Sequence, residues 1–156
     1  MSVRLASAAA ACMVLAGCGS VTSDINFQAP TSGWFASPPI LGRTQVWIKR
    51  GDKAQTGSLV FLMRGAGTTG TIFHDTPGAP NDASLTKDEN VKICGNESAE
   101  HVLGYGKTNG GTQSIFEGYI ATVHGERYVA VYVHPRNLPA DPQAEAAIRS
   151  LCPKPA

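Results

Sequence analysis

The stretch SIFEGYIATVHGERYVAVYVH, residues 114–134, specifies the fold more strongly than any other part of the chain. Two runs rich in β-branched and aromatic residues flank the dipeptide Gly125-Glu126, and this pattern predicts a β-hairpin. Glycine at the first central position of a two-residue loop is typical of a type II′ turn. With that turn, Ile120 is expected to lie opposite Val131 in an antiparallel pair.

Side chains of the predicted hairpin alternate between two faces. The first, which we call the aliphatic face, carries Phe116, Ile120, Val129, Val131 and Val133. The second, which we call the tyrosine face, carries Glu117, Tyr119, Tyr128, Tyr132 and His134. Aromatic rings with polar tips are common in binding surfaces, so the tyrosine face is a candidate interaction surface; burial under another element is the alternative. The same register places Glu117 beside His134, where the carboxylate would raise the proton affinity of the imidazole.

Residues 141–152 have the pattern of an amphipathic helix. Asp141 is a good N-cap residue, and Pro142 suits the first helical position. Apolar residues then follow at i, i+3, i+4, i+7 and i+8, namely Ala144, Ala147, Ile148, Leu151 and Cys152. Pro153 ends the pattern, because proline is not tolerated in a helix interior. We expect this helix to lie across the aliphatic face of the hairpin, which needs cover.

Upstream of the hairpin, residues 44–50 and 58–64 are β-rich runs that predict a second hairpin. Asn81 or Asp82 is the expected N-cap of a short helix that extends through Glu89. Further short strands are expected at residues 71–74, 91–94 and 100–105. The predicted fold class is therefore α+β, a mainly antiparallel sheet flanked by a C-terminal helix and a short middle helix. A single domain of this kind is expected over residues 25–156.

The N-terminal segment has the layout of a secretory signal, with Arg4 followed by an apolar run over residues 5–15. The sequence Leu15-Ala16-Gly17-Cys18 resembles the lipobox of bacterial lipoproteins. This resemblance implies removal of residues 1–17, acylation of Cys18, and a polar tether over residues 18–24. Two or more acyl chains would make the membrane anchor stable. Gly19 stands where an inner-membrane retention signal would have Asp, which favours the outer membrane. An ordinary cleaved signal peptide that contains a cysteine is the alternative.

Charge and cysteine content narrow the class of protein. The chain has 13 Lys and Arg residues against 12 Asp and Glu, so loss of Arg4 with the signal makes the two kinds of charge equal. There is no basic block, which argues against nucleic acid as a partner. Of the four cysteines, Cys12 leaves with the signal and Cys18 is acylated, so Cys94 and Cys152 remain. In an oxidising compartment this pair predicts a disulfide; two buried thiols are the alternative. Neither cysteine has a second Cys or a His at metal-ligand spacing, so no metal site is expected.

Catalytic and cofactor motifs are weak in this chain. GAGTTG at residues 65–70 matches the G-x-G-x-x-G pattern of dinucleotide-binding proteins. A phosphate site of that type needs a helix N-terminus after the glycines, and Pro77, Gly78 and Pro80 exclude one, so no cofactor is expected. The four histidines show no ligand or catalytic spacing. A hydrolase would need His74, His101 or His134 within about 3 Å of a Ser, Asp or Glu that lines a cleft.

The order of predicted elements adds a family resemblance. The motif F-x-x-P-x-x-G-W over residues 27–34, a hairpin, a helix-containing middle, the YVAVYV hairpin and a closing helix together resemble the PsbP/Mog1-like domains, which include periplasmic lipoproteins of the DcrB type. This resemblance implies an antiparallel sheet flanked by helices and an accessory or adaptor role. We therefore expect a non-catalytic binding or assembly module, anchored through Cys18 in a bacterial envelope, on the periplasmic side of the outer membrane, with an envelope protein as partner. A small-ligand-binding lipoprotein is the alternative, and a hydrolase is third.

Overall fold

The 114–134 hairpin is the centre of the fold. In the computed structural model, β7 (Gln113–Val123) and β8 (Glu126–Pro135) pair antiparallel, as predicted. The turn is His124-Gly125, and both residues have positive φ, 49° and 81°, which defines a type I′ turn and corrects the predicted type II′ turn at Gly125-Glu126. Ile120 therefore lies opposite Val129, not Val131. Histidine tolerates the left-handed region better than most residues, which lets it share this turn with glycine.

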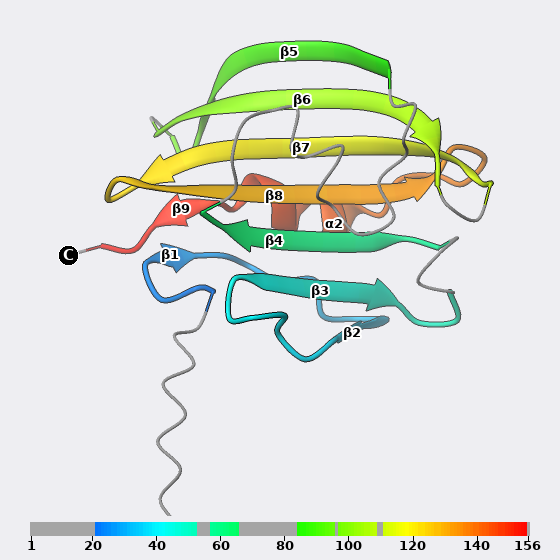
Figure 1. Ribbon diagram of the computed structural model, residues 1–156, viewed down its shortest axis with the longest axis horizontal. Coiled ribbons are helices and arrows are strands. Elements are labelled where there is room, and N and C mark those ends of the chain that lie inside the picture. The colour runs from blue at the N-terminus through cyan, green and yellow to red at the C-terminus, as the bar shows by residue number, and fades with distance from the viewer. Residues whose placement is uncertain (1–20, 53–56, 66–83, 96, 109–110, 156) are drawn as a thin grey trace, which may run out of the picture.

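A seven-stranded antiparallel sheet is built around this hairpin (Figure 1). The structure describes residues 21–52, 57–65, 84–95, 97–108 and 111–155. The strand order is β2-β3-β4-β8-β7-β6-β5. The remaining strands of this sheet are β2 (Trp34–Ala36), β3 (Thr44–Lys49), β4 (Leu59–Arg64), β5 (Ser84–Ile93) and β6 (Glu97–Lys107). The predicted hairpin over residues 44–50 and 58–64 is confirmed as β3 and β4.

The predicted middle helix is wrong. Residues 84–93 form the edge strand β5, which pairs with β6 over its whole length. Its charged, polar sequence resembles a solvated helix, but backbone pairing with a neighbouring strand overrides local propensity. The shorter strands expected at 91–94 and 100–105 are parts of β5 and β6, and the strand expected at 71–74 lies outside the described residues.

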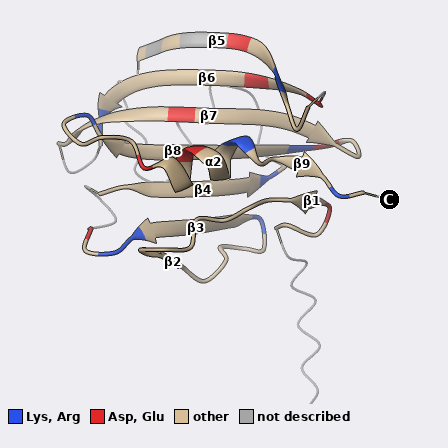
Figure 2. Ribbon diagram, turned by 180° about the vertical axis from the view of Figure 1, so that it is seen from behind, with Lys and Arg blue, Asp and Glu red and all other residues tan. Residues whose placement is uncertain are grey.

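The C-terminal helix α2 (Pro142–Arg149) is confirmed, with Asp141 as N-cap and proline at the first position. It ends earlier than expected, so Cys152 belongs to β9 (Cys152–Pro153), which pairs with β1 (Ile25–Asn26). The helix lies over the tyrosine face of the hairpin, and not over the aliphatic face as predicted (Figure 2). This placement gives a buried polar group on the tyrosine face its hydrogen-bond partner. The Tyr132 hydroxyl accepts a hydrogen bond of 3.0 Å from the Asp141 amide at the start of the helix, and a buried hydroxyl needs such a partner.

Two hydrophobic cores result, one on each side of the sheet. On the helix side, buried residues of α2 and β1 join the tyrosine face, among them Ile25, Ala144 and Ile148. On the other side, the aliphatic face continues across β3, β4 and β6 through Val46, Leu59, Phe61, Met63 and Val102. All the members of both cores named here are less than 9% exposed.

Candidate functional site

The predicted interaction surface, the tyrosine face, is part of the core. Tyr119, Tyr128 and Tyr132 are 6%, 0% and 1% exposed, which supports the alternative of burial under another element. The Tyr128 hydroxyl donates to Asp24 at 3.1 Å. Burial raises the pKa of both Tyr128 and Tyr132, so their hydroxyls stay protonated and act as structural hydrogen-bonding groups.

Glu117 and His134 do not form the predicted pair. In the observed register Glu117 lies opposite Tyr132, and His134 lies opposite Ile115. The His134 ring is buried and stacks on Tyr132 with centroids 4.8 Å apart, while its Nδ1 lies 3.1 Å from the carbonyl oxygen of Pro135. Burial lowers the pKa of His134, although the Pro135 carbonyl opposes this change. His134 is therefore a neutral core residue.

Glu117 instead belongs to a row of charged side chains that crosses the sheet beside α2. His101 on β6 lies between two carboxylates, with its Nε2 2.9 Å from Glu117 Oε1 and its Nδ1 3.5 Å from Glu89 Oε1. Arg149, the last residue of α2, reaches the same Glu117 oxygen at 3.8 Å. We call Glu89, His101, Glu117 and Arg149 the charged row. The imidazole of His101 stacks on Tyr119 at 4.6 Å, which holds the ring in place between the carboxylates.

The charged row runs from a shielded centre to exposed ends. The side chains of His101 and Glu117 are 11% and 16% exposed, whereas those of Glu89 and Arg149 are 44% and 58% exposed. The centre can form an ion pair whenever His101 is protonated. The ends expose a carboxylate and a guanidinium to solvent, and a guanidinium suits planar, charged groups. Of the residues that sequence reasoning singled out, His101, Glu117 and Tyr119 meet here.

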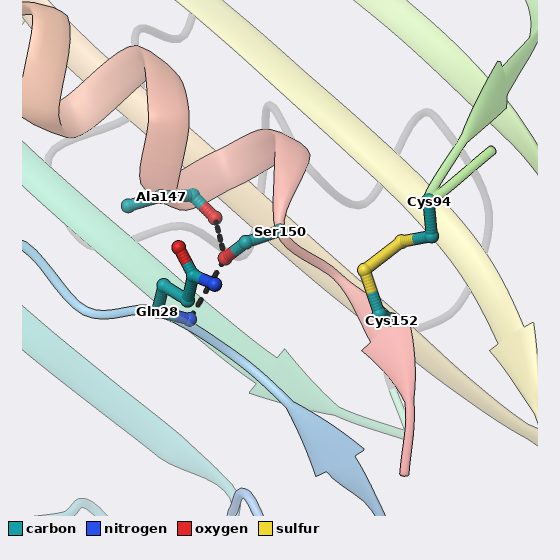
Figure 3. Close-up of a disulfide and its surroundings, with 5 residues drawn as sticks. All are labelled: Gln28, Cys94, Ala147, Ser150 and Cys152. Atoms are coloured by element: carbon teal, nitrogen blue, oxygen red, sulfur yellow. Dashed lines mark hydrogen bonds between the residues drawn. A yellow bond between two sulfur atoms is a disulfide. The ribbon is translucent and has the colours of Figure 1, made fainter. Parts of the chain in front are cut away.

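Cys94 and Cys152 form the predicted disulfide, with their Cα atoms 5.8 Å apart. Cys94 lies in the turn between β5 and β6, and Cys152 lies in β9, so the bond fastens the end of the chain to the tip of a hairpin (Figure 3). Next to it, the Ser150 hydroxyl accepts from the amide of Gln28 at 2.8 Å and donates to the Ala147 carbonyl at 2.7 Å. The segment after the helix is thus held at two points. Cys18, the predicted acylation site, lies outside the described residues.

The distance required for a hydrolase is met at one point, because His101 lies within 3 Å of Glu117. Within the described ranges, however, the polar contacts of His101 are with two carboxylates, and no serine or cysteine is among them. The larger described hollow, of about 520 Å³, lies over Glu100, Ile120, Thr122 and Arg127 on the opposite side of the sheet. The histidine contact therefore shows an ordered polar cluster of one imidazole and two carboxylates.

Among the described residues, no group of three or more His, Cys, Asp or Glu side chains is arranged to hold a metal ion. In the same part of the chain, no helix has the length and apolar character that a membrane span requires.

No known protein family and no curated protein matches the sequence. One solved structure with a similar fold is that of PA94 from Pseudomonas aeruginosa, a protein of unknown function described as a candidate regulator. The two chains are 12% identical, the match covers 79% of this chain and 99% of PA94, and the TM-score is 0.47. The functional proposal therefore rests on the residues of this chain.

Proposed function

We propose that this chain is an envelope lipoprotein, acylated at Cys18, that presents a non-catalytic β-sheet domain to a partner protein. The observation that carries the proposal is the position of Val21. This residue is 4% exposed and packs in the same core as Ile25, only three positions after the lipobox cysteine. An acyl group on Cys18 would therefore be joined to the packed domain by a very short segment, which supports a domain held close to its membrane anchor.

The disulfide supports an extracytoplasmic location. Cys94 and Cys152 are 58 positions apart, and their bond joins the turn after β5 to β9. Disulfides persist in the periplasm and outside the cell and are rare where glutathione keeps thiols reduced. Together with Gly19 after the lipobox cysteine, this supports the periplasmic side of the outer membrane.

The edge of the sheet supports a protein partner. β5 is a ten-residue strand at one edge of the described sheet, and Glu89, Asn90 and Lys92 on it are exposed. An edge strand can pair with an extended segment of another protein, and charged side chains on the edge limit unspecific pairing. The charged row begins at Glu89 on this strand, so backbone pairing and charge recognition can act together. An accessory role of this kind agrees with the resemblance to PsbP/Mog1-like domains.

Acylation is tested by metabolic labelling of the full chain with radioactive palmitate in a bacterial host. We expect label in the parent chain and in Cys12→Ala, which removes the other N-terminal cysteine, but not in Cys18→Ala. The Cys18→Ala protein should also leave the membrane fraction. Label that persists in Cys18→Ala would contradict the proposal.

Partner binding is tested by placing a photo-crosslinking amino acid at Asn90 on β5 in the lipidated protein in cells. A matched control carries the same amino acid at Asn137, an exposed residue after the far end of β8. We expect a discrete protein adduct from position 90 that is absent from position 137. Identical adducts from both positions, or none from either, would count against a partner at the β5 edge.

A further inference from the structure

The turn between β2 and β3 exposes apolar side chains that the fold does not use. Leu41 is 93% exposed and the adjacent Ile40 is 47% exposed. The turn is tight, because the Ile40 carbonyl accepts hydrogen bonds from the amides of Arg43 and Thr44, both at 3.1 Å. Leu41 has a φ of 51°, a left-handed conformation that glycine or asparagine adopts more easily. A leucine that is both strained and fully exposed contributes nothing to the core.

This turn lies at the end of the domain where the described chain begins. The Arg43 carbonyl accepts a hydrogen bond of 2.8 Å from the Arg64 amide at the end of β4. The Arg64 guanidinium in turn contacts Ser23 at 3.1 Å and Asp24 at 3.0 Å. Lys154 donates to the Ser23 carbonyl at 2.8 Å. Figures 1 and 2 show the start of β3, the end of β4, and β1 with β9 at this same end.

The lipid anchor would hold this end close to a membrane. Val21 is fixed in the core, and only two residues separate it from Cys18. Three residues of fully extended chain span at most about 11 Å. With the acyl chains of Cys18 in the bilayer, the end of the domain that carries Val21, Ser23 and the turn must lie near the headgroups.

We propose that the Ile40-Leu41 turn is a second membrane contact, which inserts into the bilayer that holds the Cys18 anchor. The inference rests on the acylation proposed above. Apolar side chains enter the boundary between headgroups and acyl chains, while Arg43 and Lys154 lie at the level of the lipid phosphates. Two contacts fix the orientation of the domain, so that β5, which lies along the sheet edge, runs away from the membrane with its far end exposed to the periplasm.

The test uses the full lipidated protein in vesicles of phosphatidylethanolamine and phosphatidylglycerol with brominated acyl chains, which quench nearby tryptophan. The parent chain is a low background, because Trp34 and Trp47 are 4% and 8% exposed and lie in the core. Leu41→Trp adds a reporter at the turn. Leu138→Trp is the matched control, since Leu138 is 47% exposed and follows β8 at the opposite end of the sheet.

We expect brominated lipid to remove most of the emission that Leu41→Trp adds, and to leave the emission that Leu138→Trp adds unchanged. Ile40→Trp provides the same reading should Leu41→Trp fail to fold. Unquenched emission at positions 40 and 41, or equal quenching at 41 and 138, would overturn the second contact while leaving the anchor intact. Failure of the protein to float with the vesicles would instead overturn the anchor itself.

Discussion

The two faces of the β7–β8 hairpin are equally buried but are held together differently. The aliphatic face consists of aliphatic side chains and Phe116, and its neighbours on β3, β4 and β6 are also apolar. The tyrosine face contains hydroxyls and an imidazole, and its buried polar atoms have specific partners at the start of α2, in Asp24 and in the Pro135 carbonyl. Alternation thus defines the two faces, and the face that the helix covers is the one whose buried polar atoms need partners.

The two faces also contribute to the stability of the fold in different ways. On the aliphatic face, stability comes from burial and close packing, which depend on volume. On the tyrosine face, Ala144, a small residue of α2, packs in the same core as the large rings and lets the helix approach them. There, hydrogen bonds and the disulfide add contributions that depend on individual partners. Substitutions on the two faces should therefore differ in how much they lower the free energy of unfolding and in how that loss depends on pH.

The largest effect is expected on the aliphatic face. Phe61 is 1% exposed, and Phe61→Ala should lower the free energy of unfolding by about 3–5 kcal/mol because it leaves a cavity. Urea unfolding followed by circular dichroism measures this change. Phe35→Ala is the control, since Phe35 is 45% exposed and should contribute much less. Equal losses for the two variants would show that the aliphatic face is not a packed core.

Removal of the disulfide is the next test and concerns the helix side. The Cys94→Ser, Cys152→Ser double variant should lose up to about 4 kcal/mol of unfolding free energy, because the open chain gains conformational entropy when unfolded. The comparison is made by urea unfolding with and without a reducing agent. Reductant should destabilise the parent chain and leave the double variant unchanged. A parent chain insensitive to reductant would contradict a structural role for this bond.

A single hydrogen bond on the tyrosine face should matter less than packing. Tyr132→Phe removes the acceptor of the Asp141 amide and should cost about 1–3 kcal/mol, the range for a buried donor left without its partner. Thermal unfolding measures the loss. Tyr105→Phe is the control, because Tyr105 is only half-buried and lies under Arg136. A Tyr132→Phe protein as stable as the control variant would remove the proposed reason for the placement of the helix.

The weakest effect is a dependence on pH that only the tyrosine face should show. Burial lowers the pKa of His134 below its ordinary value of 6.5, so the folded chain binds this proton less readily than the unfolded chain. The contribution of the neutral His134 imidazole to the stability of the folded chain is complete above pH 6.5 and is lost as the pH falls below that value. His134→Phe should therefore show a flatter profile of urea midpoint against pH, from about pH 8 to pH 5, than the parent chain. Parallel profiles would show that His134 does not titrate differently in the two states.

Acidic groups extend this dependence to lower pH. Burial alone would raise the pKa of Asp141, but the hydrogen bond and charge of Lys49 and the Gln143 amide hold it below its usual range. A hydrogen bond from Ser23 likewise lowers the pKa of Asp24. Both carboxylates stabilise the folded chain above their ordinary pKa values, and this stabilisation is lost as the pH falls through the lowered ones.

Much of the fold follows from local sequence patterns. The β7–β8 and β3–β4 hairpins, the alternation of faces, the cap and stripe of α2 and the Cys94–Cys152 pair all depend on residues close in sequence or on simple elimination. The exact register of β7–β8 was not predictable from Gly125, because a type I′ turn at His124-Gly125 and a type II′ turn one residue later use the same glycine. A shift by two residues keeps every side chain on its face, so the pattern cannot distinguish them.

The candidate site was less predictable, because it joins four elements. Glu89 comes from β5, whose polar sequence predicts a helix, and Arg149 comes from a helix whose predicted position is on the other face of the hairpin. With residues 84–93 as a strand, antiparallel pairing to β6 places Glu89 beside His101. The contact of Glu117 with Arg149 depends on tertiary packing alone, and no local pattern indicates it.

Intact mass spectrometry of the protein, extracted from membranes with detergent and kept oxidised, tests most directly whether Cys18 is the acylated N-terminus of a disulfide-bonded mature chain. The predicted result is the mass of residues 18–156 with a diacylglyceryl group and an N-terminal acyl chain, less two hydrogens for the Cys94–Cys152 bond. An unlipidated chain, or one that still carries residues 1–17, would contradict the proposal.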